Sequence, residues 1–128
     1  MRFGRLLLLL MVVVAACSSS TEAIAMVHAP TARDLIAEPG TVLLDIRTPQ
    51  EFAEVRIEGA INLDFYAPDF AAQIAALDQS VAYVVYCRSG NRSEQAMEMF
   101  RDLRFTEVHE LEGGILTWLD AGLPTVSG

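Results

Sequence analysis

The order of hydrophobic and polar residues predicts short strands that alternate with amphipathic helices. Runs of β-branched and large apolar residues are typical of strands, and apolar residues three or four positions apart are typical of helices. The predicted strands are Thr41–Arg47, Gly59–Leu63, Val81–Tyr86 and Thr106–Leu111. The predicted helices are Ala32–Glu38, a turn from Pro49 through Phe52, Pro68–Leu77, Glu94–Leu103 and a last helix that follows Gly113-Gly114 and ends near Gly122. This alternation predicts an α/β domain with a mostly parallel sheet.

The segment Val81–Tyr86 is the most strand-like of the chain. Because it is apolar on both faces, we expect it to be a central parallel strand covered by helices on both sides. The polar residues Cys87–Arg92 follow it, and Ser93 is the predicted cap of the next helix. In open α/β sheets, ligands bind at the carboxyl ends of the strands. The sequence therefore directs attention to the loop that begins at Cys87.

The first sixteen residues indicate a secretory signal peptide rather than part of the fold. Two arginines precede an apolar run from Leu6 to Ala16, which is too short to span a bilayer. The end of this run, Val14-Ala15-Ala16-Cys17, resembles the lipobox of bacterial lipoproteins. The resemblance implies cleavage before Cys17 and attachment of a diacylglyceryl group to its sulfur.

This interpretation divides the chain into a signal peptide (1–16), a lipidated cysteine with a polar tether (17–27) and one folded domain (28–128). It predicts a lipid-anchored protein of the bacterial cell envelope that faces the periplasm, and Ser18 favours the outer membrane. The alternative is cleavage after the small residues around Ala25, which would give a soluble periplasmic or secreted protein.

Composition excludes several functions. The 128 residues carry a net charge of −8, and without Arg2 and Arg5 of the leader the charge is −10, so nucleic-acid binding through a basic surface is not expected. We expect membrane contact only through the lipid. Two cysteines rule out a disulfide scaffold, and His28 and His109 fit no metal-ligand spacing with Cys87, so neither a metal nor another bound cofactor is expected.

The loop Cys87–Ser93, with the sequence CRSGNRS, carries the candidate chemistry. A cysteine at the strand end is a nucleophile, and Gly90 permits backbone N–H groups to turn inward. The helix that follows directs its positive end toward the loop, and Arg88 and Arg92 add positive charge. Each of these features favours the thiolate over the thiol.

Four ordered motifs resemble the rhodanese-like family of sulfurtransferases with a single domain. They are the cysteine loop, LLDIRTPQEF (43–52) with Asp45, Arg47 and Glu51, EGAINL (58–63), and a C-terminal set of Leu111-Glu112-Gly113-Gly114, Trp118 and Gly122-Leu123-Pro124. The match spans essentially the whole predicted domain. It implies a rhodanese-like fold with a central, mostly parallel five-stranded sheet flanked by helices. One departure is Arg56, which stands where many members have histidine.

The resemblance implies a persulfide cycle. The Cys87 thiolate would take the sulfane sulfur of a small anionic donor such as thiosulfate and pass it to cyanide, a thiol or a protein acceptor, with no cofactor beyond the covalent persulfide. The amides and side chains of the loop would bind the donor; these residues are Arg88, Ser89, Gly90, Asn91, Arg92 and Ser93. Asp45 and Arg47 are expected to brace the strand end or the loop by ion pairing, with Glu51 as a further partner. Glu110 and Glu112 are interpreted as solvated.

Two alternatives stay open. A phosphatase or an arsenate reductase also uses a cysteine loop, but with arginine six positions after the cysteine, where this chain has Ser93; its arginine falls at the fifth position, Arg92. The other alternative is a non-catalytic rhodanese-like module that binds a partner or carries sulfur.

Overall fold

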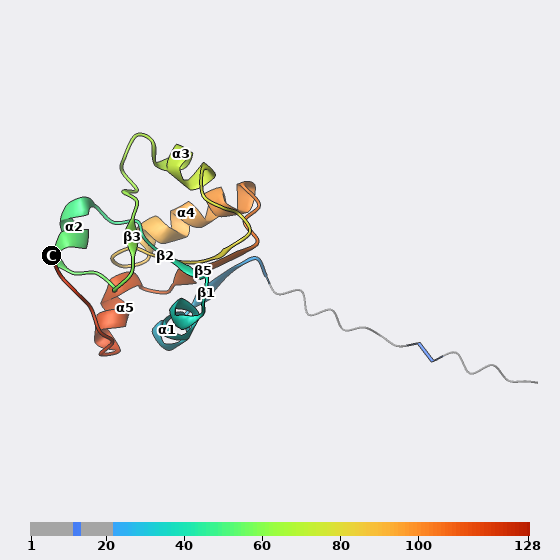
Figure 1. Cartoon of the computed structure of the whole chain (residues 1–128), viewed down its shortest axis with the longest axis horizontal. Coiled ribbons are helices and arrows are strands. Elements are labelled where there is room, and N and C mark those ends of the chain that lie inside the picture. The colour runs from blue at the N-terminus through green and yellow to red at the C-terminus, as the bar shows by residue number, and fades with distance from the viewer. Residues whose placement is uncertain (1–11, 14–21) are drawn as a thin grey trace, which may run out of the picture.

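A computed structural model describes residues 12–13 and 22–128 (Figure 1). Its centre is a five-stranded sheet in the order β1-β5-β4-β2-β3. The strands are β1 (Ile24–Val27), β2 (Val42–Asp45), β3 (Ile61–Asn62), β4 (Ala82–Tyr86) and β5 (Glu107–Leu111). The helices are α1 (Ala29–Ala37), α2 (Pro49–Glu54), α3 (Phe70–Ala75), α4 (Asn91–Asp102) and α5 (Gly114–Asp120). All four strand pairings are parallel, so the α/β prediction of a mostly parallel sheet is confirmed.

Helices cover both faces of the sheet, which explains the apolar character of β4. Figure 1 shows α3 and α4 on one face and α1 and α5 on the other. Tyr83, Val85 and Cys87 pack in the core on the α4 side, whereas Val84 and Tyr86 pack in the core that contains α1 and α5 residues. Successive side chains of a strand point to opposite faces, so a central strand with two covered faces needs apolar residues at every position.

The predicted elements are present, with three corrections at their boundaries. Residues 24–27, which the sequence assigned to the tether, form the edge strand β1 and pair with β5. Helix α1 begins at Ala29 after His28, not after Thr31. Helix α4 begins at Asn91 after Gly90, so Ser93 lies inside the first turn and is not the cap. The pairing with β5, Pro30 in the first turn of α1 and the left-handed conformation of Gly90 account for these three boundaries.

The predicted lipid site and most of the predicted signal peptide lie outside the described residues. Cys17 and residues 1–11 and 14–16 belong to that part, so cleavage and lipidation stay predictions. Within residues 12–13 and 22–128, none of the helices is both long and apolar enough to cross a bilayer.

The glycine pair before α5 permits a close backbone contact with the residues after β4. Gly113 and Gly114 have φ angles of 70° and 62°, in the left-handed region that favours glycine. A Cβ on Gly114 would lie 2.5 Å from the carbonyl oxygens of Cys87 and Arg88. The same two carbonyls accept hydrogen bonds from the first turn of α5, at 2.9 Å from Ile115 N and 3.2 Å from Leu116 N. The turn therefore fixes the start of the cysteine loop.

Replacement of Gly114 by alanine should disrupt this contact. The matched control is Gly122→Ala, because Gly122 also has a positive φ, of 71°, but an added Cβ meets nothing within 4 Å. Gly122→Ala should cost about 1–2 kcal/mol of backbone strain. Gly114→Ala adds a clash with backbone atoms, and we expect a loss of about 3 kcal/mol or more. Urea unfolding measures both values, and equal losses would contradict the close approach.

Candidate active site

Cys87 lies directly after β4, beneath its own loop. The residue is 1% exposed. The Gly90 N–H donates a hydrogen bond to Cys87 Sγ at 3.1 Å, so the chain curls back over the sulfur within three residues. Gly90 has a φ of 99°, a conformation that L side chains rarely adopt and that the curl requires. The loop therefore curls over the sulfur and places one backbone donor against it.

The N-terminus of α4 adds further donors to this loop. The Glu94 N–H donates to the Gly90 carbonyl at 3.0 Å and closes the first turn of the helix. The N–H groups of residues 91–93 precede this bond, so they have no partner within the helix. Such a turn carries partial positive charge and binds anions. The arrangement can stabilise negative charge on a sulfur atom at the Cys87 position.

Ser93 contacts the cysteine from inside the helix. Its Oγ lies 3.5 Å from Cys87 Sγ and 3.2 Å from the Gly90 carbonyl oxygen, and it donates to Glu110 Oε1 at 2.8 Å. Glu110 is 5% exposed, so its interpretation as a solvated residue is wrong, whereas Glu112 is exposed. A partial signal was present in the sequence, because Glu110 is two positions from the apolar Val108 and therefore faces the same side of the sheet.

Arg92 is paired with Glu51 rather than directed toward open solvent. Its Nη1 and Nη2 donate to Glu51 Oε2 and Oε1 at 2.8 and 2.9 Å. Glu51 also accepts from the Thr48 N–H at 2.9 Å in a capping box at the start of α2. The guanidinium lies 5.5 Å from the centre of the exposed Tyr66 ring. Two of the five N–H donors of Arg92 are thus used by Glu51, and the pair connects α4 to α2.

This pairing determines the ionisation of Glu51. The hydrogen bond from Arg92, with further bonds from Thr48, lowers the pKa of Glu51 from 4.5 to about 2, against the opposing effect of burial. Glu51 is consequently a carboxylate at neutral pH, and it keeps the guanidinium of Arg92 beside the loop.

The remaining predicted loop residues present their side chains to solvent. Arg88, Ser89 and Asn91 are exposed, and the Asn91 side chain accepts a hydrogen bond from Gln95 at 2.9 Å. Ser89, Gly90 and Asn91 line a cavity of about 310 Å³, together with Glu94 and Glu110. A substrate that approaches the loop from this side meets small and acidic residues.

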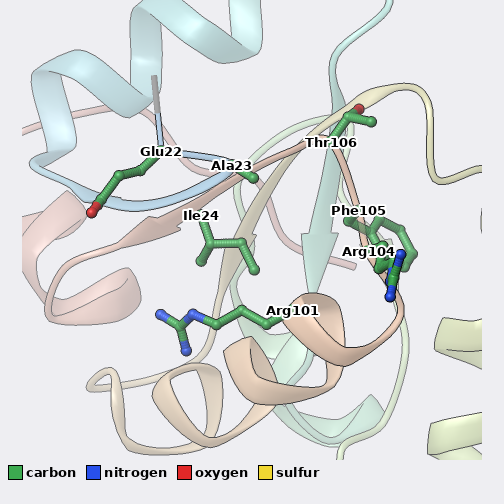
Figure 2. A pocket seen from close by; sticks show the side chains of 7 residues that line it. All are labelled: Glu22, Ala23, Ile24, Arg101, Arg104, Phe105 and Thr106. Atoms are coloured by element: carbon green, nitrogen blue, oxygen red, sulfur yellow. The ribbon is translucent and has the colours of Figure 1, made fainter. Parts of the chain in front are cut away.

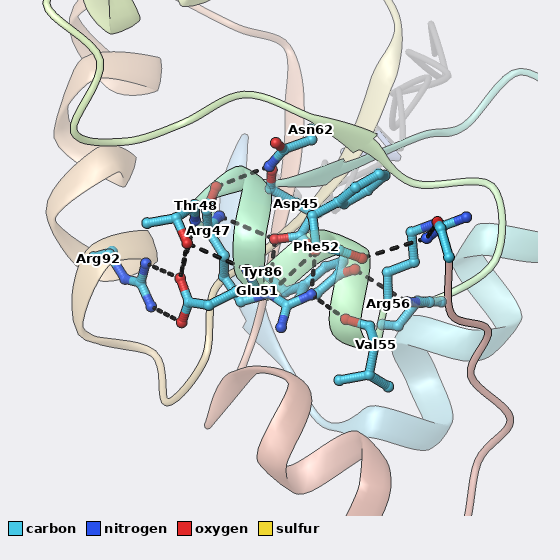
Figure 3. A network of polar contacts seen from close by, with 12 residues as sticks. Asp45, Arg47, Thr48, Glu51, Phe52, Val55, Arg56, Asn62, Tyr86 and Arg92 are labelled. Atoms are coloured by element: carbon cyan, nitrogen blue, oxygen red, sulfur yellow. Dashed lines mark hydrogen bonds and ion pairs between the residues drawn. The ribbon is translucent and has the colours of Figure 1, made fainter.

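Asp45 and Arg47 form a buried brace at the end of β2, which Figure 3 shows. Arg47 donates from Nε to Asp45 Oδ1 at 2.9 Å and from Nη2 to Oδ2 at 2.6 Å, and Nη2 also reaches the Val55 carbonyl. Asn62 donates to the Asp45 and Arg47 carbonyls from β3. Among the described residues, no hydrogen bond joins Asp45 or Arg47 to the cysteine loop. Their contacts are structural, since they hold the strand end and the segment after α2.

Arg56, which stands where the resemblance predicts histidine, holds the C-terminal residues against the domain. Its backbone pairs with Val126 in an antiparallel bridge, and its Nη1 donates to the Gly128 carbonyl. The guanidinium lies over the Phe52 ring at 4.7 Å (Figure 3). No hydrogen bond in the described part of the chain connects Arg56 to Cys87.

A separate cavity lies at the opposite end of the sheet, at the amino ends of β1 and β5. It has a volume of about 520 Å³, and Arg101 and Arg104 line it beside Ile24 and Phe105 (Figure 2). Since Cys87 follows the carboxyl end of β4, this cavity is remote from the loop and takes no part in its chemistry.

The comparisons with known proteins agree with this geometry. Residues 28–121 match the family model described as "Rhodanese-like domain". "Thiosulfate sulfurtransferase 16, chloroplastic" of Arabidopsis thaliana is 36% identical over 109 residues, which cover 77% of this chain and 90% of that protein. "Uncharacterized protein slr1261" of Synechocystis is 33% identical over 84% of this chain, and the match spans only 59% of that longer relative.

A solved structure has the same arrangement. The rhodanese-related protein of Thermoplasma volcanium aligns with a TM-score of 0.71 at 28% identity, over 80% of this chain and 97% of that one. The predicted five-stranded fold is therefore confirmed by a known protein as well as by the topology of the sheet.

Neutralisation of Glu51 should destabilise the protein in a pH-dependent way. The pKa of Glu51 is lower in the folded state, so its stabilising effect is fully present above pH 4.5 and is lost as the pH falls through about 2. Glu51→Gln should reduce the free energy of unfolding by about 1–2 kcal/mol at pH 7, allowing for partial solvent exposure of the pair.

The matched control is Glu54→Gln, an exposed glutamate on the same helix, which should change stability by less than about 0.5 kcal/mol. Urea unfolding at pH 7, 5 and 3 measures both variants. The difference between Glu51→Gln and the wild type should shrink at the lowest pH. A constant difference across this range would show that the charge of Glu51 is not responsible.

Proposed function

Because the chain belongs to the rhodanese-like family, we propose that it is a sulfurtransferase that carries sulfane sulfur as a persulfide on Cys87. The observation that carries the proposal is the hydrogen bond from the Gly90 N–H to Cys87 Sγ, at 3.1 Å, at the N-terminus of α4. A backbone donor aimed at a sulfur favours an anion at that atom. A cysteine that only fills space in the core does not require a hydrogen-bond donor directed at its sulfur.

The cycle consists of two nucleophilic displacements. In the first, the Cys87 thiolate attacks the outer sulfur of thiosulfate, the new S–S bond forms, and sulfite leaves with the electron pair of the broken bond. The cysteine now holds a persulfide anion. In the second, a nucleophile such as cyanide attacks the terminal sulfur and forms a C–S bond. The S–S bond breaks, its electron pair stays on Cys87 as the restored thiolate, and thiocyanate departs. Both displacements conserve atoms and charge, so no cofactor is needed.

The chain's own groups have distinct roles in these steps. The Gly90 N–H and the first turn of α4 stabilise the anionic sulfur. Arg92, oriented by Glu51, contributes positive charge beside the loop. The exposed Arg88 is available to contact the sulfonate end of a donor. The acceptor remains open among cyanide, thiols and proteins.

A phosphatase or an arsenate reductase is less compatible with this site. A phosphoryl group needs an arginine whose guanidinium is directed to its oxygens. Arg92 instead forms a two-bond pair with the Glu51 carboxylate.

A non-catalytic rhodanese-like module is the second candidate, and the burial of Cys87 favours it. With an exposed fraction of 1%, Cys87 is covered by the surrounding structure. Such burial is also typical of an inert cysteine. A chemical test of the sulfur therefore separates the two candidates.

The test is mass spectrometry of the full chain after treatment with thiosulfate. The wild-type protein should gain about 32 Da, one sulfur atom, on the peptide that contains Cys87, and lose it when cyanide is added. Thiocyanate production gives the rate. Cys87→Ser should reduce this rate to the uncatalysed background.

The matched control is Cys17→Ser, which removes the other cysteine of the chain and should leave thiocyanate production unchanged. A protein that gains no mass at Cys87 and forms no thiocyanate with any of several acceptors would be a binding module.

A further inference from the structure

Glu110 is a buried carboxylic acid that the two displacements do not use. It lies on β5 with 5% of its surface exposed, and its Oε1 accepts the hydrogen bond from Ser93 Oγ at 2.8 Å. A buried carboxyl group is costly to keep charged unless it is paired. No arginine, lysine or histidine forms an ion pair with it in the described part of the chain. Its position is therefore unusual enough to require a chemical explanation.

The hydroxyl group of Ser93 connects this carboxyl to the cysteine. A hydroxyl has one proton to donate and two lone pairs that accept. Around Ser93 Oγ lie Glu110 Oε1 at 2.8 Å, the Gly90 carbonyl oxygen at 3.2 Å and Cys87 Sγ at 3.5 Å. The single proton is directed to the nearest acceptor, the carboxylate. A lone pair of Oγ then faces the sulfur and accepts from the thiol.

The chain of three groups has two self-consistent arrangements. In one, the Cys87 thiol donates to Ser93 and Ser93 donates to the Glu110 carboxylate. In the other, the Glu110 carboxylic acid donates to Ser93 and Ser93 donates to the Cys87 thiolate. Every donor has an acceptor in both arrangements, and the number of protons is the same. When Cys87 and Glu110 are both ionised, only the single Ser93 proton lies between the two anions, one of them lacks a donor, and the state is disfavoured.

We propose that Glu110 is a positioning residue that shares one proton with Cys87 through the hydroxyl group of Ser93. The proton of the thiol moves to Ser93 Oγ while the original Ser93 proton moves to Glu110 Oε1. The S–H electron pair stays on the sulfur as the thiolate. One thiol and one carboxylate become one thiolate and one carboxylic acid, Ser93 is unchanged, and nothing is oxidised or reduced.

The surroundings of Glu110 favour its uptake of the proton. Burial raises the pKa of the Glu110 carboxyl against the hydrogen bond from Ser93, which lowers it, and the charge of Glu94 raises it further. The charged groups that face Glu110 are Glu94, Glu98 and Arg101 from α4 and Glu112 after β5, while β1 contributes no titratable side chain. Arg101 opposes the three acidic residues. On the other side of the cysteine, Glu51 holds the positive charge of Arg92 beside the loop.

This inference deepens the proposed function, and it rests on that proposal only for the use of the thiolate. Its test therefore measures ionisation and not sulfur transfer. The ultraviolet absorbance of the Cys87 thiolate is recorded against pH for the full chain, as the difference from the same protein with Cys87→Ser. This difference cancels the contributions of Cys17 and of the tyrosines, and it requires no reagent to reach the buried sulfur.

Two groups that share a proton lose their protons in two separate steps. The wild-type absorbance should thus rise in two steps whose midpoints lie more than about one pH unit apart. Glu110→Gln keeps the size and the hydrogen-bond acceptor of the side chain but cannot take a proton. Its absorbance should rise in one step, with a midpoint between the two wild-type midpoints.

Two further variants complete the test. Glu94→Gln removes an exposed carboxylate that lines the same cavity and has no bond to Ser93, so it should keep two steps. Ser93→Ala leaves both titrating groups but removes the hydroxyl, and its two steps should move together. If circular dichroism shows that Glu110→Gln does not fold, Ser93→Ala serves as the test variant in its place.

A wild-type profile with one step, or the same two steps in both Glu110→Gln and Ser93→Ala, would overturn the proposal. If the absorbance rises in two steps but thiosulfate leaves no persulfide on Cys87, the proposal of a shared proton is supported and the proposal of sulfur transfer is refuted. The two proposals are therefore separated by experiment.

Discussion

The structure around Cys87 depends on one constraint, the curl that brings the Gly90 N–H to within 3.1 Å of Cys87 Sγ. The loop is held at both ends. At its start, the Cys87 and Arg88 carbonyls accept bonds from α5, and this contact requires a residue without a side chain at Gly114. At its end, Gly90 adopts a left-handed conformation and α4 begins at once. The position of the sulfur thus follows from the backbone, and side chains then adjust its charge.

Two ion pairs lie near the carboxyl ends of the strands, and they differ in burial and in effect. Asp45 and Arg47 are almost fully buried, and their bonds to each other and to Val55 hold β2 and the segment after α2 in place. Glu51 and Arg92 are partly exposed, and they bring a positive charge to the loop. Removal of one partner of the first pair would leave a buried charge without compensation. Loss of one partner of the second pair should cost less, because solvent can hydrate the charge that is left.

The overall acidity of the chain makes this local positive charge important. With a net charge of −8, the surface repels small anions at long range. The loop amides, the N-terminus of α4 and the two arginines of the loop oppose that repulsion at short range. The carboxylates of Glu94, Glu110 and Glu112 lie on the other side of the loop and line the neighbouring cavity. Positive and negative charges therefore lie on different sides of the same loop.

Much of the fold could be predicted from the sequence. Val81–Tyr86 is apolar at every position, which only a covered central strand requires, and the glycines at 90, 113 and 114 mark the turns around the loop. β1 was not predicted, because Ile24–Val27 is short and acquires its structure by pairing with β5, more than eighty residues away. The role of Glu110 was also missed, since its burial depends on Ser93, a residue of another element.

The most direct test of the account is a crystal structure of the full chain after treatment with thiosulfate. We predict a second sulfur atom bonded to Cys87 Sγ at about 2 Å, directed into the loop and in contact with the N–H groups at the start of α4. A second sulfur that points away from these N–H groups, or an unmodified Cys87 in crystals that received the donor, would contradict the central claim.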